Sequence, residues 1–158
     1  MNADRPESHA NLALIYTAQG RFHDPETAYR NALSLEPRFA EASINLTDRL
    51  RMMNRENDSA DVLENALAKD PKHPALNHAY GLLLVRRKRL DEALPYLAKA
   101  ANDPALTRFN YVYAVALSEV GRQQEALRVA ERALAQRTED RDLRGLLEEL
   151  GAQTEENR

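Results

Sequence analysis

The chain repeats itself at an interval of 34 residues. The segment NALSLEP at 31–37 returns as NALAKDP at 65–71, and longer stretches that begin at residues 11, 45, 79 and 112 align with offsets of 34, 34 and 33. A fixed period of this size is typical of one supersecondary unit that is stacked several times. We therefore divide the chain into four units, 6–39, 40–73, 74–106 and 107–140, after a short lead at 1–5.

Small residues recur in each unit where two helices must approach closely. The clearest column is Ala32, Ala66, Ala100 and Ala133, and two others are Ala13, Thr47, Gly81 and Ala114, then Ser59, Ala93 and Ala126. A larger side chain at such a crossing would overpack it, at a cost of roughly 1–3 kcal/mol. Apolar residues three, four or seven apart lie between these columns, which is the spacing of an apolar stripe on a helix. Each unit is therefore predicted to be a pair of helices.

One column marks the end of the first helix in each unit. Gly20 and Gly121 fill it in two units, and Asn54, the next-best residue for a left-handed helix end, fills it in another. Lys88 occupies the column in the third unit, where we expect a strained or differently built turn. The second helices are expected to end at the Glu-Pro or Asp-Pro pairs 36–37, 70–71 and 103–104, because the residue before proline is pushed out of the helical region.

Two prolines lie inside the predicted second helices. Pro25 takes a small-residue position, so we expect that helix to begin late, with Asp24 as its N-cap and Pro25 as its first residue. Pro95 is expected in a first turn, where its missing N–H costs little.

One more apolar stripe follows the fourth unit, formed by Leu143, Leu146, Leu147 and Leu150. Repeat arrays need a polar outer face at their end. We therefore predict a capping helix over 141–151 that Gly151 ends, followed by a frayed tail at 152–158.

These columns resemble the tetratricopeptide repeat family. Its motif is met most fully by Tyr80-Gly81-x2-Leu84, Ala93-x3-Leu97 and Pro104, and the resemblance covers residues 6 to about 150. It implies an all-α fold, a right-handed α–α superhelix (solenoid) of four helix pairs plus the capping helix. The first helices of the pairs would line its concave side.

Composition argues against several classes of function. Lys and Arg number 22 against 25 Asp and Glu, so the net charge of −3 gives no electrostatic footprint for nucleic acid. The chain has no cysteine, which removes thiolate nucleophiles and Cys-ligated zinc. Neither a signal peptide nor a run of eighteen apolar residues is present, so we expect no membrane insertion, and cytoplasm and periplasm stay equally open.

The sequence also lacks a recognisable catalytic constellation. His73 and His78 are five residues apart and separated by Pro74, which argues against a shared metal face. The five glycines are spread along the chain rather than gathered in a phosphate loop. The basic run at 86–89 is interpreted as a solvated helix end, with a phosphate or acidic-partner site as the alternative. We therefore predict no enzyme, no metal and no cofactor.

The resemblance implies that repeat positions 2, 5, 9 and 12 of the first helices face the groove. At these positions, and beside them, an apolar strip with charged residues at its rim is expected. The candidate partner-binding residues are Leu14, Ile44, Asp48, Arg51, His78, Leu82, Val85, Arg86, Tyr111, Val115 and Ser118, with Arg108 and Glu119 also at the rim. Such a strip is typical of a site for another chain. The alternative is that later helices cover it or that a tight superhelix closes the groove.

The leading hypothesis is a non-enzymatic scaffold that binds a protein or peptide segment, helical or extended, in this groove. A second hypothesis is a homodimer through the uncapped first repeat, where apolar residues such as Ile15 lack a preceding helix. A third is an accessory domain of a larger bacterial envelope protein, because the segments 80–101 and 108–134 look like repeats found in such proteins. The identity of the partner stays open.

Overall fold

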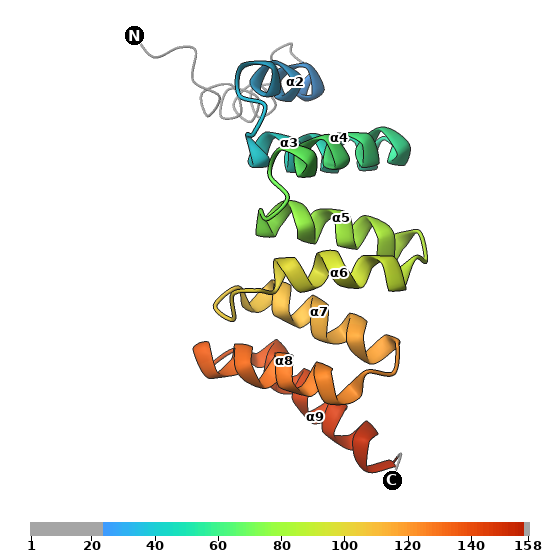
Figure 1. Ribbon diagram of the computed structural model, residues 1–158, viewed down its shortest axis with the longest axis vertical. Coiled ribbons are helices and arrows are strands. Elements are labelled where there is room, and N and C mark those ends of the chain that lie inside the picture. The colour runs from blue at the N-terminus through green and yellow to red at the C-terminus, as the bar shows by residue number, and fades with distance from the viewer. Residues whose placement is uncertain (1–23, 157–158) are drawn as a thin grey trace. The chain divides into compact units, whose positions relative to one another are not determined.

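The structure, a computed structural model, describes residues 24–156. These residues form helices joined by short turns, labelled α2 to α9 in Figure 1, and the described part contains no strand. The helices are α2 (Pro25–Leu35), α3 (Ala40–Met52), α4 (Glu56–Lys69), α5 (Pro74–Arg86), α6 (Leu90–Ala100), α7 (Thr107–Glu119), α8 (Gln123–Gln136) and α9 (Arg141–Glu156). The prediction of an all-α helical repeat is confirmed. Among the described residues, no helix is both long and apolar enough to cross a bilayer.

The chain divides into two compact units, Met1–Tyr80 and Gly81–Arg158, and the division falls inside α5. These two bodies are larger than the four repeated units of the sequence. From here on, unit 1 means Met1–Tyr80 and unit 2 means Gly81–Arg158. In unit 1, α3 packs against both α2 and α4. Its core contains Tyr29, Ala32 and Leu46, and Ala32 is fully buried, as expected for a residue at a helix crossing. Ser59 is also fully buried, and its hydroxyl donates to the backbone carbonyl of Thr47 at 3.5 Å, so two small residues of the repeat columns meet.

The start of α2 agrees with the prediction from Pro25. Asp24 is the N-cap, and its carboxylate accepts a hydrogen bond from the backbone N–H of Glu26 at 3.3 Å. Pro25 is the first helical residue, where its missing N–H would have had no partner within the helix.

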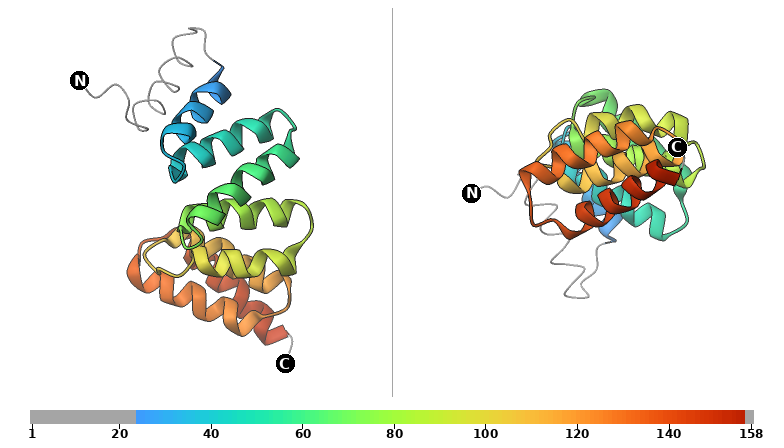
Figure 2. Two further views of the ribbon diagram at one scale, coloured as in Figure 1. Left: turned by 45° about the horizontal axis from the view of Figure 1, so that its top comes forward. Right: turned by 90° about the horizontal axis from the view of Figure 1, so that it is seen from below.

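In unit 2, α7 packs against α6, α8 and α9, and α8 also packs against α9. Figure 2 shows these helices from two further sides. Leu97 and Leu117 are fully buried, and so are Ala100 and Ala133 of the small-residue column. Gly81 lies so close to α6 that a Cβ atom built on it would be 2.6 Å from Cδ2 of Leu97. Close approach therefore explains glycine at this position.

Three turns between paired helices have the same construction. Asn54, Lys88 and Gly121 have φ angles of 57°, 58° and 78°, in the left-handed region. After each of them, the backbone N–H of an arginine (Arg55, Arg89, Arg122) donates to the carbonyl of a leucine (Leu50, Leu84, Leu117) at 2.9 Å. These bonds satisfy the last carbonyls of the first helix in the pattern of a Schellman motif. Of the two alternatives expected at Lys88, the strained turn is confirmed, because this lysine adopts the left-handed conformation in a turn built like the other two.

Two other expectations need correction. Pro95 lies inside α6, five residues after its first residue Leu90, and not in the first turn. Gly151 does not end the capping helix, because α9 continues to Glu156 over part of the predicted tail. The extension is held by Gln153, whose side-chain oxygen accepts hydrogen bonds from Gln123 at 2.8 Å and from Ser118 at 3.4 Å.

Candidate partner-binding site

A largely apolar hollow of about 600 Å³ opens on unit 2. Its walls come from the end of α5, the turn after it, the first residue of α6, and α7. The lining residues are Leu82, Val85, Lys88, Leu90, Tyr111, Val112, Val115, Ala116 and Glu119. Pockets of this order of volume accommodate a small ligand or a few side chains of a partner. We call this feature the α5–α7 hollow.

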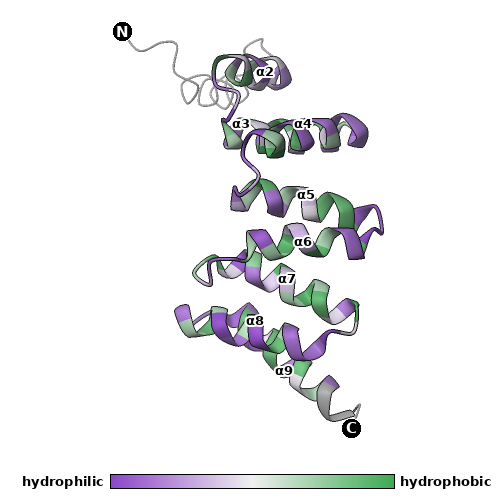
Figure 3. Ribbon diagram, viewed as in Figure 1, coloured by the Kyte–Doolittle hydropathy of each residue, from purple (hydrophilic) through white to green (hydrophobic). Residues whose placement is uncertain are grey.

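Helical spacing explains why these side chains share one surface. Along α5, Leu83 and Leu84 point into the core and are at most 2% exposed, whereas Leu82 and Val85, three residues apart, line the hollow. In Figure 3 the hydrophobic colour is concentrated in the second halves of α5 and α7. Val85 is 37% exposed. An apolar side chain this open contributes little to the core, so the surface has apolar area that internal packing leaves uncovered.

The α5–α7 hollow carries one charge of each sign. Lys88 comes from the turn after α5, and Glu119 is the last residue of α7. Both side chains are exposed, and neither forms an ion pair or a side-chain hydrogen bond with another residue in the described part of the chain. Both charges are therefore accessible to a partner.

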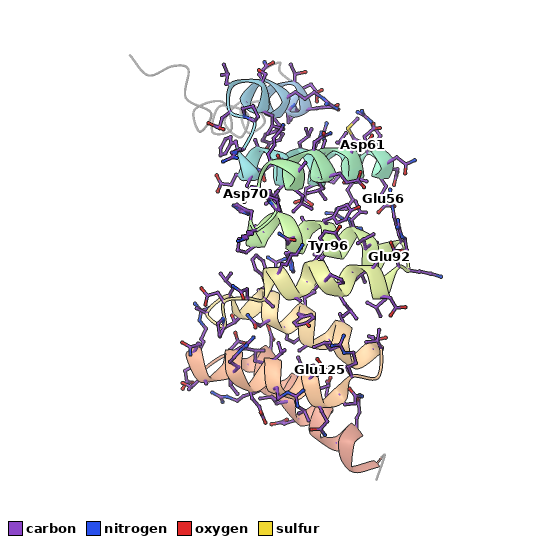
Figure 4. The ribbon with its side chains drawn as sticks, viewed as in Figure 1. Glu56, Asp61, Asp70, Glu92, Tyr96 and Glu125 are labelled. Atoms are coloured by element: carbon purple, nitrogen blue, oxygen red, sulfur yellow. The ribbon has the colours of Figure 1, made fainter. Side chains whose placement is uncertain are left out.

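Arginines next to the turns are already engaged by carboxylates. Nε and Nη2 of Arg89 donate to the two carboxylate oxygens of Glu92, both at 2.6 Å, and Arg122 holds Glu125 in the same way at 2.7 Å. These hydrogen bonds lower the pKa of Glu92 and of Glu125 below the usual value for a glutamate, so both are ionised at neutral pH. Figure 4 labels the two glutamates, in the first turns of α6 and α8.

Four of the predicted partner-binding residues meet in the α5–α7 hollow: Leu82, Val85, Tyr111 and Val115. Arg86 is exposed at the end of α5 but does not line the α5–α7 hollow. Ser118 is partly buried and donates to Gln153 of α9, so the capping helix engages this candidate.

The other candidates lie in unit 1. Ile44 is partly buried, and Asp48 and Arg51 are exposed on α3 with 3.5 Å between their charged groups. His78 is only 7% exposed, which favours a packing role. Leu14 lies outside the described residues, and so does the face around Ile15 on which self-association was predicted.

Lining residues that the sequence analysis missed are Lys88, Leu90, Val112 and Ala116. Leu90 belongs to a second helix, whereas the groove positions of the repeat lie on first helices. Val112 and Ala116 each follow a predicted lining residue, so a stripe one residue wider would have included them. Lys88 was identified as a turn residue, and sequence alone did not show that its side chain reaches this surface.

The structure contains other hollows with a more charged lining. One of about 320 Å³ in unit 1 includes Arg30 and Lys69, and one of about 610 Å³ on α7 and α8 includes Arg128, Glu131 and Arg132. In the described part of the chain, no three His, Asp or Glu side chains are grouped so that they could hold a metal ion. Apolar lining and accessible charges together make the α5–α7 hollow a better candidate than these two hollows.

Family models match most of the chain. One tetratricopeptide repeat model matches residues 48–145, and a second matches residues 6–39. No curated protein sequence matches the chain.

Several solved structures share the fold. The chain is 21% identical to YrrB, described as a TPR protein with an unusual peptide-binding site, over 98% of this chain and 80% of that one, with a TM-score of 0.71. It is 21% identical to pilF of Pseudomonas aeruginosa over 96% of this chain and 69% of that one, with a TM-score of 0.78. It is 23% identical to a thermophilic TPR protein of Thermus thermophilus over 94% of this chain and 82% of that one, with a TM-score of 0.69. The family models and the shared fold agree with the repeat columns, and the chain belongs to the tetratricopeptide repeat family.

Proposed function

We propose that this protein is a non-enzymatic scaffold that binds a segment of a partner protein in the α5–α7 hollow. The tetratricopeptide repeat is generally a protein-interaction module rather than a catalyst. The partner segment inserts one or two apolar side chains between α5 and α7, and polar groups at the rim orient it.

The observation that carries this proposal is the exposed apolar lining. Leu82, Val85, Tyr111 and Val115 line the same hollow, where Val85 is exposed and the other three are only partly buried. A contiguous apolar surface next to charged residues is typical of a protein-interaction site. Burial of such side chains by a partner is favourable by about 25 cal/mol for each Å² of apolar area.

The similarity to YrrB supports a peptide as the partner. That protein is described as having an unusual peptide-binding site, and its fold is shared over 98% of this chain. A peptide segment also suits the α5–α7 hollow, because its volume of about 600 Å³ accommodates a few side chains rather than a domain.

The test uses purified protein and a displayed library of random 12-residue peptides. We expect the wild-type protein to enrich a set of related peptides. The double variant Leu82→Glu with Val115→Glu should bind those peptides more than about tenfold more weakly, because each glutamate would have to lose its hydration when a peptide covers it.

Val129→Glu is the matched control. Val129 is also a partly buried valine of unit 2, but it lines the hollow on α7 and α8 instead. Its replacement should leave peptide affinity unchanged, while circular dichroism verifies that all variants remain helical. If the double variant binds the same peptides as tightly as the wild type does, the α5–α7 hollow is not the site.

A further inference from the structure

The three equivalent turns raise the question of why one of them contains lysine. Asn54, Lys88 and Gly121 have the same left-handed backbone and the same hydrogen bonds to the preceding helix. Glycine adopts this conformation without a steric cost, and asparagine is among the residues that tolerate it best. Lysine has neither advantage. The fold of the turn therefore favours a different residue at position 88.

The surroundings of the side chain distinguish this position from the other two. Of the three turn residues, Lys88 alone lines the α5–α7 hollow. Backbone strain of this kind persists where the surrounding structure holds the conformation, and binding sites are common among such places. The strained backbone and the apolar hollow are independent observations, and they meet at one residue.

Internal electrostatics do not account for this lysine. A cation near the end of α5 is favourable because of the helix dipole, but Arg86 and Arg87 already provide positive charge there without a left-handed backbone. Arg89 is bound to Glu92. Lys88 forms no side-chain hydrogen bond or ion pair with the residues at 24–153, whose side chains the structure describes.

We propose that Lys88 selects the partner: its ammonium group pairs with an aspartate or glutamate side chain next to the apolar residues that enter the α5–α7 hollow. This inference rests on the proposed function and adds the charge of the partner to it. The apolar lining supplies affinity, and the ammonium group restricts binding to segments in which an acidic residue follows or precedes the apolar anchor.

A second charged lining residue adds a constraint on the partner. Glu119 also lines the α5–α7 hollow and has no described partner. Glu119 repels any carboxylate close to it and attracts a basic group. An internal segment can place an acidic side chain at Lys88 and a basic side chain at Glu119, so that both walls meet an opposite charge. The proposed partner is therefore a segment with an acidic side chain for Lys88 and a basic side chain for Glu119.

The experiment uses peptides enriched by the wild-type protein, synthesised with acetylated amino ends and amidated carboxyl ends. Only side chains then carry charge. Each peptide has a partner in which its acidic residue is replaced by the corresponding amide. Affinities are measured by fluorescence anisotropy at low salt, and thermal unfolding is followed by circular dichroism.

Three substitutions separate the charge of Lys88 from its backbone conformation. Lys88→Gln removes the charge and keeps a side chain in the left-handed region, so it should weaken binding of the acidic peptides about three- to tenfold with little change in Tm. Lys88→Gly should weaken binding equally and raise Tm by about 2–4 °C, because it relieves the strain. Lys88→Arg should retain binding within about twofold, because it keeps the charge.

Asn54→Gly is the control for the turn. It relieves the equivalent conformation in unit 1, so Tm should rise while peptide affinity stays the same. For the amide forms of the peptides, Lys88→Gln should cause no loss of affinity, because no carboxylate is left to pair with position 88.

The outcomes separate this inference from the proposed function. If the enriched peptides lack acidic residues, or if Lys88→Gln binds the acidic and amide forms as the wild type does, the role of Lys88 is refuted while the hollow remains a binding site. If no peptide is enriched, or if Leu82→Glu with Val115→Glu leaves binding intact, both proposals fail. A loss specific to acidic peptides, with Tm raised only in the two glycine variants, supports the role of Lys88.

Discussion

At the residue scale, the size of a single side chain determines how closely paired helices approach. Ala114 is fully buried in α7, and Ala93 and Ala126 are fully buried near the starts of α6 and α8. Gly81 is the extreme case, because even a methyl group there meets Leu97. Leu97 is itself fully buried, so it has little freedom to move away.

Gly81→Ala is therefore expected to destabilise the protein. Alanine is the better helix former by about 1 kcal/mol. The new Cβ would lie 2.6 Å from Cδ2 and 2.8 Å from Cγ of Leu97, however, and overpacking of this kind costs about 1–3 kcal/mol. We expect the clash to outweigh the helix propensity, with a net loss of up to about 2 kcal/mol in the free energy of unfolding, measured by urea denaturation.

Gly145→Ala is the matched control for that substitution. Gly145 lies within α9, and a Cβ built on it has no atom within 4 Å. Only the helix propensity changes, so this variant should gain about 0.5–1 kcal/mol. A gain in both variants would mean that α6 can shift to make room beside Gly81.

Sequence reasoning could identify the column of Gly81 but not the clash. The period places Thr47, Gly81 and Ala114 in one column and therefore predicts small residues. The column shows that Thr is acceptable in unit 1, which suggests that Ala would fit in unit 2. The contact with Leu97 depends on the distance between two particular helices, and that distance is a property of the packed structure.

At the scale of helices, the pattern of apolar residues outweighs local breaking signals. Pro95 and Gly151 were both expected near helix ends, yet both lie inside helices. α6 forms around Pro95 because Ala93, Leu94 and Leu97 are buried on one face of it. Gly151 is followed by Gln153, whose contacts with α7 and α8 lie far away in the sequence. At Asp24 and Pro25 the signals are local, and there the prediction was confirmed.

Replacement of the internal proline should strengthen α6. At position 95 a backbone N–H would reach the carbonyl of Asp91, four residues earlier, and proline cannot make that bond. Proline within a helix costs about 3 kcal/mol relative to alanine, although its rigidity in the unfolded chain returns about 1 kcal/mol. Pro95→Ala is therefore expected to raise the free energy of unfolding by about 1–2 kcal/mol, measured by urea denaturation.

Pro25→Ala should have the opposite effect. Pro25 occupies the first position of α2, where a backbone N–H needs no partner in the helix. Its replacement only makes the unfolded chain less rigid, and it should lower the free energy of unfolding by about 0.4–1 kcal/mol.

For the internal proline, a Pro95→Ala variant that is less stable than the wild type would show that the proline ring itself packs favourably at its exposed site.

At the scale of the whole molecule, the period predicted the helical repeat more fully than it predicted the site. Four candidate residues meet in the α5–α7 hollow, because residues at fixed positions of two consecutive first helices come together. Lys88 and Leu90 escaped the prediction because they lie in the turn and at the start of the second helix. Equivalent positions of different repeats need not share an environment. Ser118 contacts the capping helix, which comes after the fourth repeat.

The repeat architecture also predicts which helices lose stability when a core residue is replaced. In helical repeats, stability is approximately the sum of local terms and nearest-neighbour interfaces. Leu143 of α9 and Leu50 of α3 are both fully buried leucines, and each substitution to alanine should cost about 2–4 kcal/mol. The two substitutions lower the free energy of unfolding by similar amounts, but they destabilise different helices.

Amide hydrogen exchange followed by mass spectrometry resolves this difference. Leu143→Ala should reduce protection in α9 and in α7 and α8, which pack against it, and leave α3 and α4 as in the wild type. Leu50→Ala should reduce protection in α2, α3 and α4 and leave α8 and α9 unchanged. If either substitution lowers protection equally in all these helices, the chain unfolds as one cooperative body. Local loss would mean instead that substitutions in unit 1 can alter stability without disturbing the α5–α7 hollow.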